Sequence, residues 1–156
     1  MTQNISYLPT DGLTYNPNQP KYWDESALQK EITRVFEVCH GCRMCFKYCD
    51  SFPSLIKFIE QNHAGDVKKI TRGETQTVMG QCFQCKLCEV QCPYTPRDQH
   101  EYQLDFPKLV HRYQAVQKKK KNKVSIRNFI FANPDQAAQA ARLSFGVANL
   151  MNRVTL

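Results

Sequence analysis

All eight cysteines of this 156-residue chain lie in two short runs that share one spacing. The runs are Cys39, Cys42, Cys45 and Cys49, then Cys82, Cys85, Cys88 and Cys92. Both have the pattern C-x2-C-x2-C-x3-C, and each cysteine of the first run precedes its counterpart by 43 positions. This internal repeat predicts two similar loop–helix units related by a pseudo-twofold axis.

The spacing resembles that of bacterial ferredoxins, in which such a run binds a [4Fe–4S] cluster. A cubane has four iron corners, and each corner needs one thiolate. Three closely spaced cysteines in a tight loop can cap three corners, so the fourth ligand must come from elsewhere. Two runs therefore predict two [4Fe–4S] clusters.

In two-cluster ferredoxins the fourth cysteine of each run ligates the other cluster. On that pattern, cluster A is held by Cys39, Cys42, Cys45 and Cys92. Cluster B is held by Cys82, Cys85, Cys88 and Cys49. This crossing would clip the runs together and keep the clusters close enough for electron tunnelling.

The residue after the fourth cysteine differs between the runs. It is Pro93 in the second run, as in bacterial ferredoxins, and Asp50 in the first. We expect Asp50 to cap the helix that follows it. Close to cluster B, its negative charge would make reduction of that cluster harder.

Zinc ions and disulfide bonds are the alternative uses for eight cysteines. Two structural zinc sites could take four ligands each. However, three cysteines that recur at every third position suit a cubane better. Disulfides are typical of secreted chains, and residues 1–20 contain neither a Sec signal nor a twin-arginine pair. We therefore expect a cytoplasmic protein whose thiols stay reduced and available to iron.

Charge and hydropathy exclude some classes of protein. The mean hydropathy is −0.54 and no long apolar run is present, which argues against a transmembrane helix. The formal charge is +7, but two oxidised clusters with their thiolates carry about −2 each. The loaded protein is then only modestly basic, so nucleic-acid binding is not favoured.

The sequence predicts a mainly α-helical domain over residues 23–117, preceded by an extended arm over residues 1–22. Whether the tyrosines of the arm lie over the domain or form a loose tail is left open. Apolar periodicity predicts a helix over 23–38 that begins after Asp24. The other expected helices are 53–61, starting at Pro53, 71–81, starting with a capping box of Thr71 and Glu74, and 98–117, interrupted at Pro107.

The rest of the chain is expected to be a basic linker, 118–123, and a helical docking segment, 124–156. The linker carries Lys118, Lys119, Lys120, Lys121 and Lys123. In the docking segment we expect one helix over 125–131 and a second that starts at Pro134. An apolar stripe follows at Leu143, Val147, Leu150, Met151 and Val154. It would be buried against this domain, a partner subunit, a membrane face or a further domain.

Four stretches resemble one family of iron–sulfur proteins. They are Cys-Phe-Gln-Cys-Lys-Leu-Cys at 82–88, Cys-Pro-Tyr-Thr-Pro at 92–96, Tyr-Trp-Asp-Glu at 22–25 and Leu-Asp-Phe-Pro-Lys at 104–108. The family comprises the two-cluster iron–sulfur subunit of heterodisulfide reductase and the N-terminal part of the iron–sulfur subunit of anaerobic glycerol-3-phosphate dehydrogenase. The resemblance covers most of residues 20–117.

The resemblance implies an α-helical ferredoxin domain that carries electrons between a redox partner and a further acceptor, often quinone. The implied partner is a flavoprotein or a redox subunit with cysteine-rich CCG domains, and a peripheral contact with the inner membrane face is left open. No C-C-G occurs here, and no acid–base pair or nucleophile stands out, so we predict no catalytic residue. The alternatives are the ferredoxin part of a multidomain glycerol-3-phosphate, glycolate or lactate dehydrogenase, and a regulatory module that binds nucleic acid through the lysine run.

Overall fold

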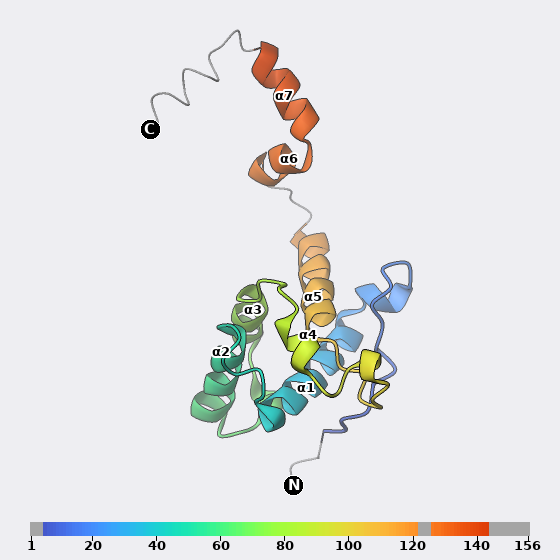
Figure 1. Cartoon of the computed structure of the whole chain (residues 1–156), viewed down its shortest axis with the longest axis vertical. Helices are drawn as coiled ribbons and strands as arrows, with labels where there is room; N and C mark the ends of the chain where they lie inside the picture. Colours follow the sequence, from blue (N-terminus) through green and yellow to red (C-terminus); the bar gives the residue numbers. More distant parts are fainter. Residues whose placement is uncertain (1–4, 122–125, 144–156) are drawn as a thin grey trace. The chain divides into compact units, whose positions relative to one another are not determined.

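In the computed structural model, the structure describes residues 5–121 and 126–143, which form helices and turns but no strand. The chain divides into two compact units, the first ending at Lys120 and the second beginning at Lys121. The helices are α1 (Glu25–Cys42), α2 (Ser51–Lys57), α3 (Arg72–Gly80), α4 (Leu87–Gln91), α5 (Phe106–Lys121), α6 (Ile126–Ala132) and α7 (Pro134–Leu143) (Figure 1). Short turns of 3-10 helix occur at η1 (Pro20–Trp23), η3 (Val67–Lys69) and η4 (Pro96–Asp98), and a π-helical turn at η2 (Phe58–Asn62). The predicted α-helical fold class is confirmed.

Helix α1 begins as expected and ends later than expected. The Asp24 side chain accepts hydrogen bonds from the backbone N–H groups of Ser26 and Ala27, which caps the first turn. The helix continues to Cys42, so the first two cysteines of the chain lie on its last turn and not in a loop. It stops at Arg43, which has a left-handed φ of 55° and donates its N–H to the carbonyl of Cys39.

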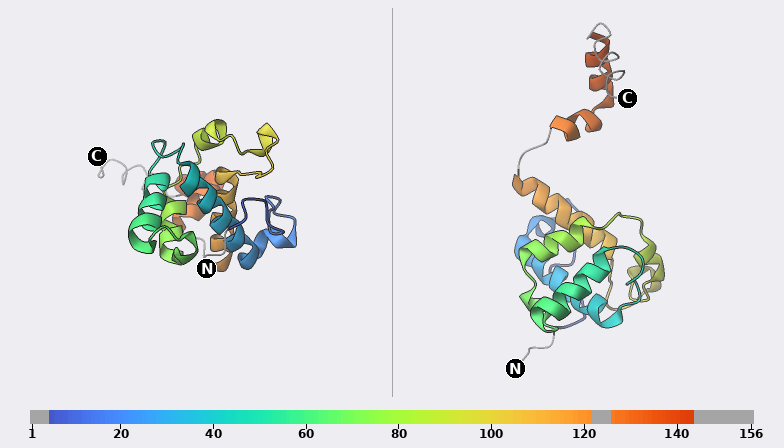
Figure 2. Two further views of the ribbon diagram at one scale, coloured as in Figure 1. Left: turned by 90° about the horizontal axis from the view of Figure 1, so that it is seen from below. Right: turned by 90° about the vertical axis from the view of Figure 1, so that its left-hand side faces the viewer.

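Helices α2 and α3 lie side by side and supply much of the core (Figures 1 and 2). Helix α2 begins at Ser51, two residues before Pro53, and the side chain of Asp50 makes no capping hydrogen bond. The expected cap is therefore wrong, because Asp50 already has helical backbone angles and its carboxylate does not reach the first N–H groups. In α3 the predicted capping box of Thr71 and Glu74 is present. The buried side chains of these two helices include Leu55, Val78 and Met79.

Residues 99–105, just before α5, are not helical, contrary to the expectation of a helix that starts at residue 98. Gln99 and Gln103 have left-handed φ angles of 55° and 45°, which interrupt any helix there. The N–H of Leu104 donates to the carbonyl of Tyr94 over 2.8 Å, which returns the chain to the second cysteine run. Helix α5 then starts with Phe106 and Pro107, and its apolar side chains Leu109, Val110, Tyr113 and Val116 are buried or half-buried. It runs on to Lys121, so Lys118–Lys121 form its last turn and are not a linker.

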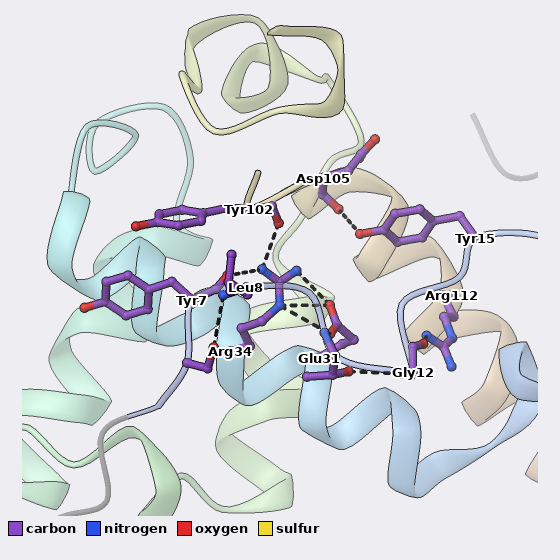
Figure 3. A network of polar contacts seen from close by, with 11 residues as sticks. Tyr7, Leu8, Gly12, Tyr15, Glu31, Arg34, Tyr102, Asp105 and Arg112 are labelled. Carbon is purple, nitrogen blue, oxygen red and sulfur yellow. Dashed lines mark hydrogen bonds and ion pairs between the residues drawn. The ribbon is translucent and has the colours of Figure 1, made fainter. Parts of the chain in front are cut away.

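The described part of the N-terminal arm, residues 5–22, is fastened to α1 by a buried ion pair (Figure 3). The side chains of Arg34 and Glu31 are 1% and 0% exposed, and Arg34 Nη2 lies 2.8 Å from Glu31 Oε2. Arg34 also donates to the carbonyls of Tyr7 (2.7 Å) and Tyr102 (2.8 Å), and Glu31 accepts from the N–H of Thr10. Both charges are therefore paired and hydrogen-bonded, as burial requires.

A second buried arginine fastens the remainder of the arm. Arg112 of α5 donates to the carbonyls of Gly12 (2.8 Å), Lys21 (2.5 Å) and Tyr22 (2.9 Å). Gly12 is required here, because a Cβ at this position would lie 2.8 Å from the Cβ of Ala27. The described arm is thus part of the first unit and not a loose tail.

The second unit contains α6 and α7, the two helices expected in the tail. Helix α7 starts at Pro134, and the carbonyl of Asn133 accepts from the N–H of Ala137. Leu143 is exposed, whereas Val147, Leu150, Met151 and Val154 lie outside the described residues. Among the described helices, none has the length and apolar character to cross a bilayer.

Candidate metal centre

Five of the eight cysteines line one hollow in the first unit. Cys39 and Cys42 come from the last turn of α1, and Cys45 comes from the loop that follows. Cys88 comes from α4, and Cys92 is the residue at which α4 ends. This cysteine hollow therefore contains the first three cysteines of the first run together with the third and fourth of the second.

The walls of the cysteine hollow are apolar. Val38, Ile56 and Leu104 line it together with Phe52 and Phe106, whose ring centroids are 4.9 Å apart. Phe52 and Phe106 are 5% and 3% exposed. Side chains of this kind exclude water from the thiols and lower the local dielectric, two factors that control the reduction potential of a bound cluster.

The thiols of the first run are electrostatic neighbours of Cys92. Burial raises the pKa of Cys39 well above its usual value, and the Cys92 thiol is the next largest cause. Burial raises the pKa of Cys45 to about 11, again with Cys92 as the next cause. The sequence separates Cys92 from this run by more than forty residues, so the fold alone makes them neighbours.

The thiols of the second run have Cys49 among their neighbours. The pKa of Cys88 is raised to about 12. Burial is the largest cause, and the charges of Cys45, Cys82 and Cys49 raise it further. Burial also raises the pKa of Cys82; the backbone N–H of Gln84 opposes that shift, and Cys49 adds to it. The two runs meet where Cys45 Sγ lies 4.0 Å from the carbonyl oxygen of Cys88.

This crowding fits iron–sulfur chemistry. Metal ligation requires thiolates, and several negative charges this close repel one another unless a cation is bound among them. Within residues 5–121 and 126–143, no three His, Cys, Asp or Glu side chains are grouped to hold one metal ion. A cubane needs a wider arrangement, because each thiolate binds a different iron. An all-cysteine donor set with this spread suits two [4Fe–4S] clusters.

Two residues that the sequence analysis did not single out hydrogen-bond to the sulfurs. Gln84 donates its side-chain amide to Cys82 Sγ (3.8 Å) and to the carbonyl of Pro107 (3.2 Å). Burial raises the pKa of Cys92, and the hydrogen bond from the backbone N–H of Tyr94 opposes that shift. The charge of Cys42 is the largest cause that raises the pKa of the Tyr94 hydroxyl, and a hydrogen bond with Cys42 adds to it. No motif marks these roles, because they depend on a left-handed turn at Gln84 and on the return of the chain after Cys92.

The outer side of both runs is unusually apolar. Six large apolar side chains between the cysteines are exposed by 40% or more, namely Met44, Phe46, Tyr48, Phe83, Leu87 and Val90. Cys85 is exposed as well, and Cys49 and Cys82 are half-buried. The cysteine runs therefore lie close to the protein surface. A position close to the surface favours electron exchange with another molecule.

Comparisons with known proteins agree with this chemistry. Residues 38–95 match the family described as 4Fe-4S dicluster domain. Citrate utilization protein B of Escherichia coli is 29% identical over 82 residues, which is 53% of this chain and 19% of that protein. The chain thus corresponds to about a fifth of that relative's length. No solved structure matches the chain.

The geometry and the comparisons agree on the fold and the cofactor. The chain has a ferredoxin-type, α-helical domain whose eight cysteines provide for two [4Fe–4S] clusters. The predicted fold class and cofactor are confirmed, and so is the wider assignment to iron–sulfur proteins.

Proposed function

We propose that this protein is an electron-transfer subunit that passes single electrons through two adjacent [4Fe–4S] clusters. The observation that carries the proposal is the cysteine hollow, in which thiols from both runs lie together behind an apolar wall. The clusters supply one-electron redox chemistry. The residues of the chain hold them, exclude water and keep them near each other and near the surface.

The proposal includes a ligand set for each cluster. Cluster A is assigned to Cys39, Cys42, Cys45 and Cys92, and cluster B to Cys82, Cys85, Cys88 and Cys49. The effect of Cys92 on the pKa of Cys39 and Cys45, and of Cys49 on the pKa of Cys82 and Cys88, supports the crossed assignment. A crossed assignment ties α1 to the loop around α4, so each cluster also connects distant parts of the first unit.

The electron route that we propose runs between a flavin dehydrogenase or disulfide-reductase-type partner and a further acceptor such as quinone. The resemblance to the iron–sulfur subunits of heterodisulfide reductase and of anaerobic glycerol-3-phosphate dehydrogenase supports it. The exposed apolar side chains around the cysteines would exclude water from the contact with such a partner.

A second candidate is the ferredoxin part of a larger oxidoreductase of the glycerol-3-phosphate, glycolate or lactate dehydrogenase type. The observation that favours it is the match to a limited part of a much longer relative. In that case the same two clusters would deliver electrons to or from a catalytic site on other residues.

The test is a redox titration of anaerobically reconstituted protein, followed by electron paramagnetic resonance. We expect two one-electron reductions, and spin–spin broadening when both clusters are reduced, because they lie close together. Photoreduced free flavin should reduce the protein, and a soluble quinone should reoxidise it without loss of iron. One uncoupled cluster, or reduction that releases iron, would contradict an electron-carrying role.

A further inference from the structure

The positive charge of the chain is concentrated in residues 118–143, called here the basic–apolar segment. Its charged residues are Lys118, Lys119, Lys120, Lys121, Lys123, Arg127 and Arg142, with Asp135 as the single acid. The segment therefore accounts for +6 of the formal +7 of the whole chain. The rest of the protein is close to neutral, so the charge is a local property of this segment and not a general one.

The same segment exposes large apolar side chains on α6. The exposed fractions are 80% for Ile126, 53% for Phe129, 48% for Ile130 and 78% for Phe131. Ile126, Phe129 and Ile130 are spaced by three and four positions, so they share one face of the helix. Every residue of α6 is exposed, and none is buried against α7.

We propose that the basic–apolar segment is a docking site for an anionic lipid bilayer. A helix that carries phenylalanine and isoleucine on one side, and that follows a run of lysines in the sequence, suits the interface of such a membrane. The apolar side chains would enter the acyl boundary, and the cations would lie among the lipid phosphates. Since no described helix is able to cross a bilayer, the helix would lie in the plane of the interface.

The contacts of the lysines decide which of them the proposal uses. Lys119 lies over the ring of Trp23, 4.2 Å from its centroid, and Lys120 is paired with Glu25. These two are engaged within the first unit. Lys118, Lys121 and Arg127 are exposed, and the proposal rests on them.

Two other occupants fit the observations less well. Nucleic acid would be attracted by the cations, but the aliphatic Ile126 and Ile130 have no stacking role on bases. A protein interface would use the apolar face, but lysine is depleted at protein interfaces. Only an anionic membrane uses the lysines and the aliphatic face together.

The experiment is co-sedimentation of the full-length, cluster-loaded protein with vesicles under anaerobic conditions. One set of vesicles is pure phosphatidylcholine, and the other contains about one third phosphatidylglycerol, enough to give a strongly negative surface. We expect binding to the anionic vesicles only, and weaker binding as salt screens the charges. In a Phe129→Trp variant, the tryptophan emission should shift to the blue when the anionic vesicles are added.

The variants separate charge from apolar insertion. Changing Lys118, Lys121 and Arg127 to Gln should weaken binding to anionic vesicles roughly a hundredfold. Phe129→Ser with Ile130→Ser keeps the charge and should weaken it at least about tenfold. The matched control changes Lys30, Lys57 and Arg72 to Gln, which removes the same charge from exposed positions of the first unit. This control should bind nearly as the wild type does.

Three outcomes would overturn the proposal. They are equal binding to neutral vesicles, equal loss in the matched control, and tighter binding to a short DNA duplex in the same buffer. The readout does not involve the clusters. A protein that transfers electrons and ignores vesicles refutes only the membrane site, whereas vesicle binding without reversible reduction refutes only the proposed function.

Discussion

The two cysteine runs have identical spacing and different backbones. In the first run, Cys39 and Cys42 lie in the last turn of α1, and α2 begins two residues after Cys49. In the second run, Cys82 and Cys85 lie in irregular chain, and only Cys88 lies in a helix, the short α4. What the runs share is a left-handed residue after the second cysteine, Arg43 with φ 55° and Lys86 with φ 62°.

This comparison shows which part of the motif the cluster determines. The turn between the second and third cysteines occurs in both runs, because three thiolates can cap one cubane only if the chain bends there. The flanking structure depends on what each run packs against. Neither residues 39–49 nor residues 82–92 contain a buried side chain. The first run begins inside α1, whose Phe36 and Val38 are buried, whereas the second begins in irregular chain after α3.

Removing the iron should therefore affect the second run far more than α1, the helix in which the first run begins. Without its clusters, the segment 82–92 loses the contacts that order it, whereas α1 keeps its apolar core. Amide exchange of residues 82–92, followed by mass spectrometry, should speed up at least about a hundredfold more than that of residues 28–38. Equal acceleration of both segments would mean that the clusters hold the whole unit together.

Pairwise cysteine changes test whether the runs exchange their fourth ligands. Cys49→Ser and Cys85→Ser should each leave about four of the eight irons, and their combination should also leave about four, because both residues serve cluster B. Cys49→Ser combined with Cys42→Ser should lose nearly all the iron. Iron analysis and electron paramagnetic resonance of the anaerobic proteins distinguish the cases. The reverse pattern would show that each run binds its own cluster.

The buried Arg34 of α1, before the first run, and the exposed Arg97, after the second, should differ in importance for stability. Arg34→Ala leaves Glu31 buried without its partner, so the free energy of unfolding should fall by about 3–5 kcal/mol. Arg97, which donates to the carbonyl of Val90 in α4 and pairs with Asp98, is half exposed. Arg97→Ala should hardly change the midpoint of thermal unfolding, since solvent screens such a pair. If the two changes lowered the midpoint equally, burial would not be the relevant difference.

The smallest expected difference concerns one hydrogen bond to sulfur. Gln84 donates to Cys82, whereas its counterpart in the repeat is Gly41, which has no side chain to donate. Gln84→Ala should lower the midpoint potential of cluster B by about 20–60 mV and leave cluster A unchanged, since a neutral hydrogen bond is worth about 0.5–1.5 kcal/mol. Gln91→Ala, an exposed residue of α4, is the matched control. A shift in both clusters would indicate a general rearrangement.

The sequence predicts the elements that depend on local chemistry. The Asp24 cap, the capping box of Thr71 and Glu74, and the start of α7 at Pro134 were all predicted, because each depends on residues a few positions apart. The cofactor could also be predicted, since cubane ligation imposes a spacing that few other sites need.

The features that the sequence did not predict depend on distant residues. The length of α1 depends on a turn at Arg43 that favours no particular residue type except glycine. The break before α5 depends on two glutamines that adopt left-handed angles where the chain returns to Tyr94. The sulfur contacts of Gln84 and Tyr94 likewise appear only after the runs are folded together.

The attachment of the N-terminal arm has a consequence for its evolution. Arg34 and Arg112 hold the arm through the carbonyls of Tyr7, Gly12, Lys21 and Tyr22, and every amino acid has a carbonyl. Substitutions in the arm can therefore accumulate without loosening it, provided that the two arginines and the glycine next to Ala27 are kept. Relatives that keep these three residues are expected to keep the arm in place even where its sequence has diverged beyond recognition.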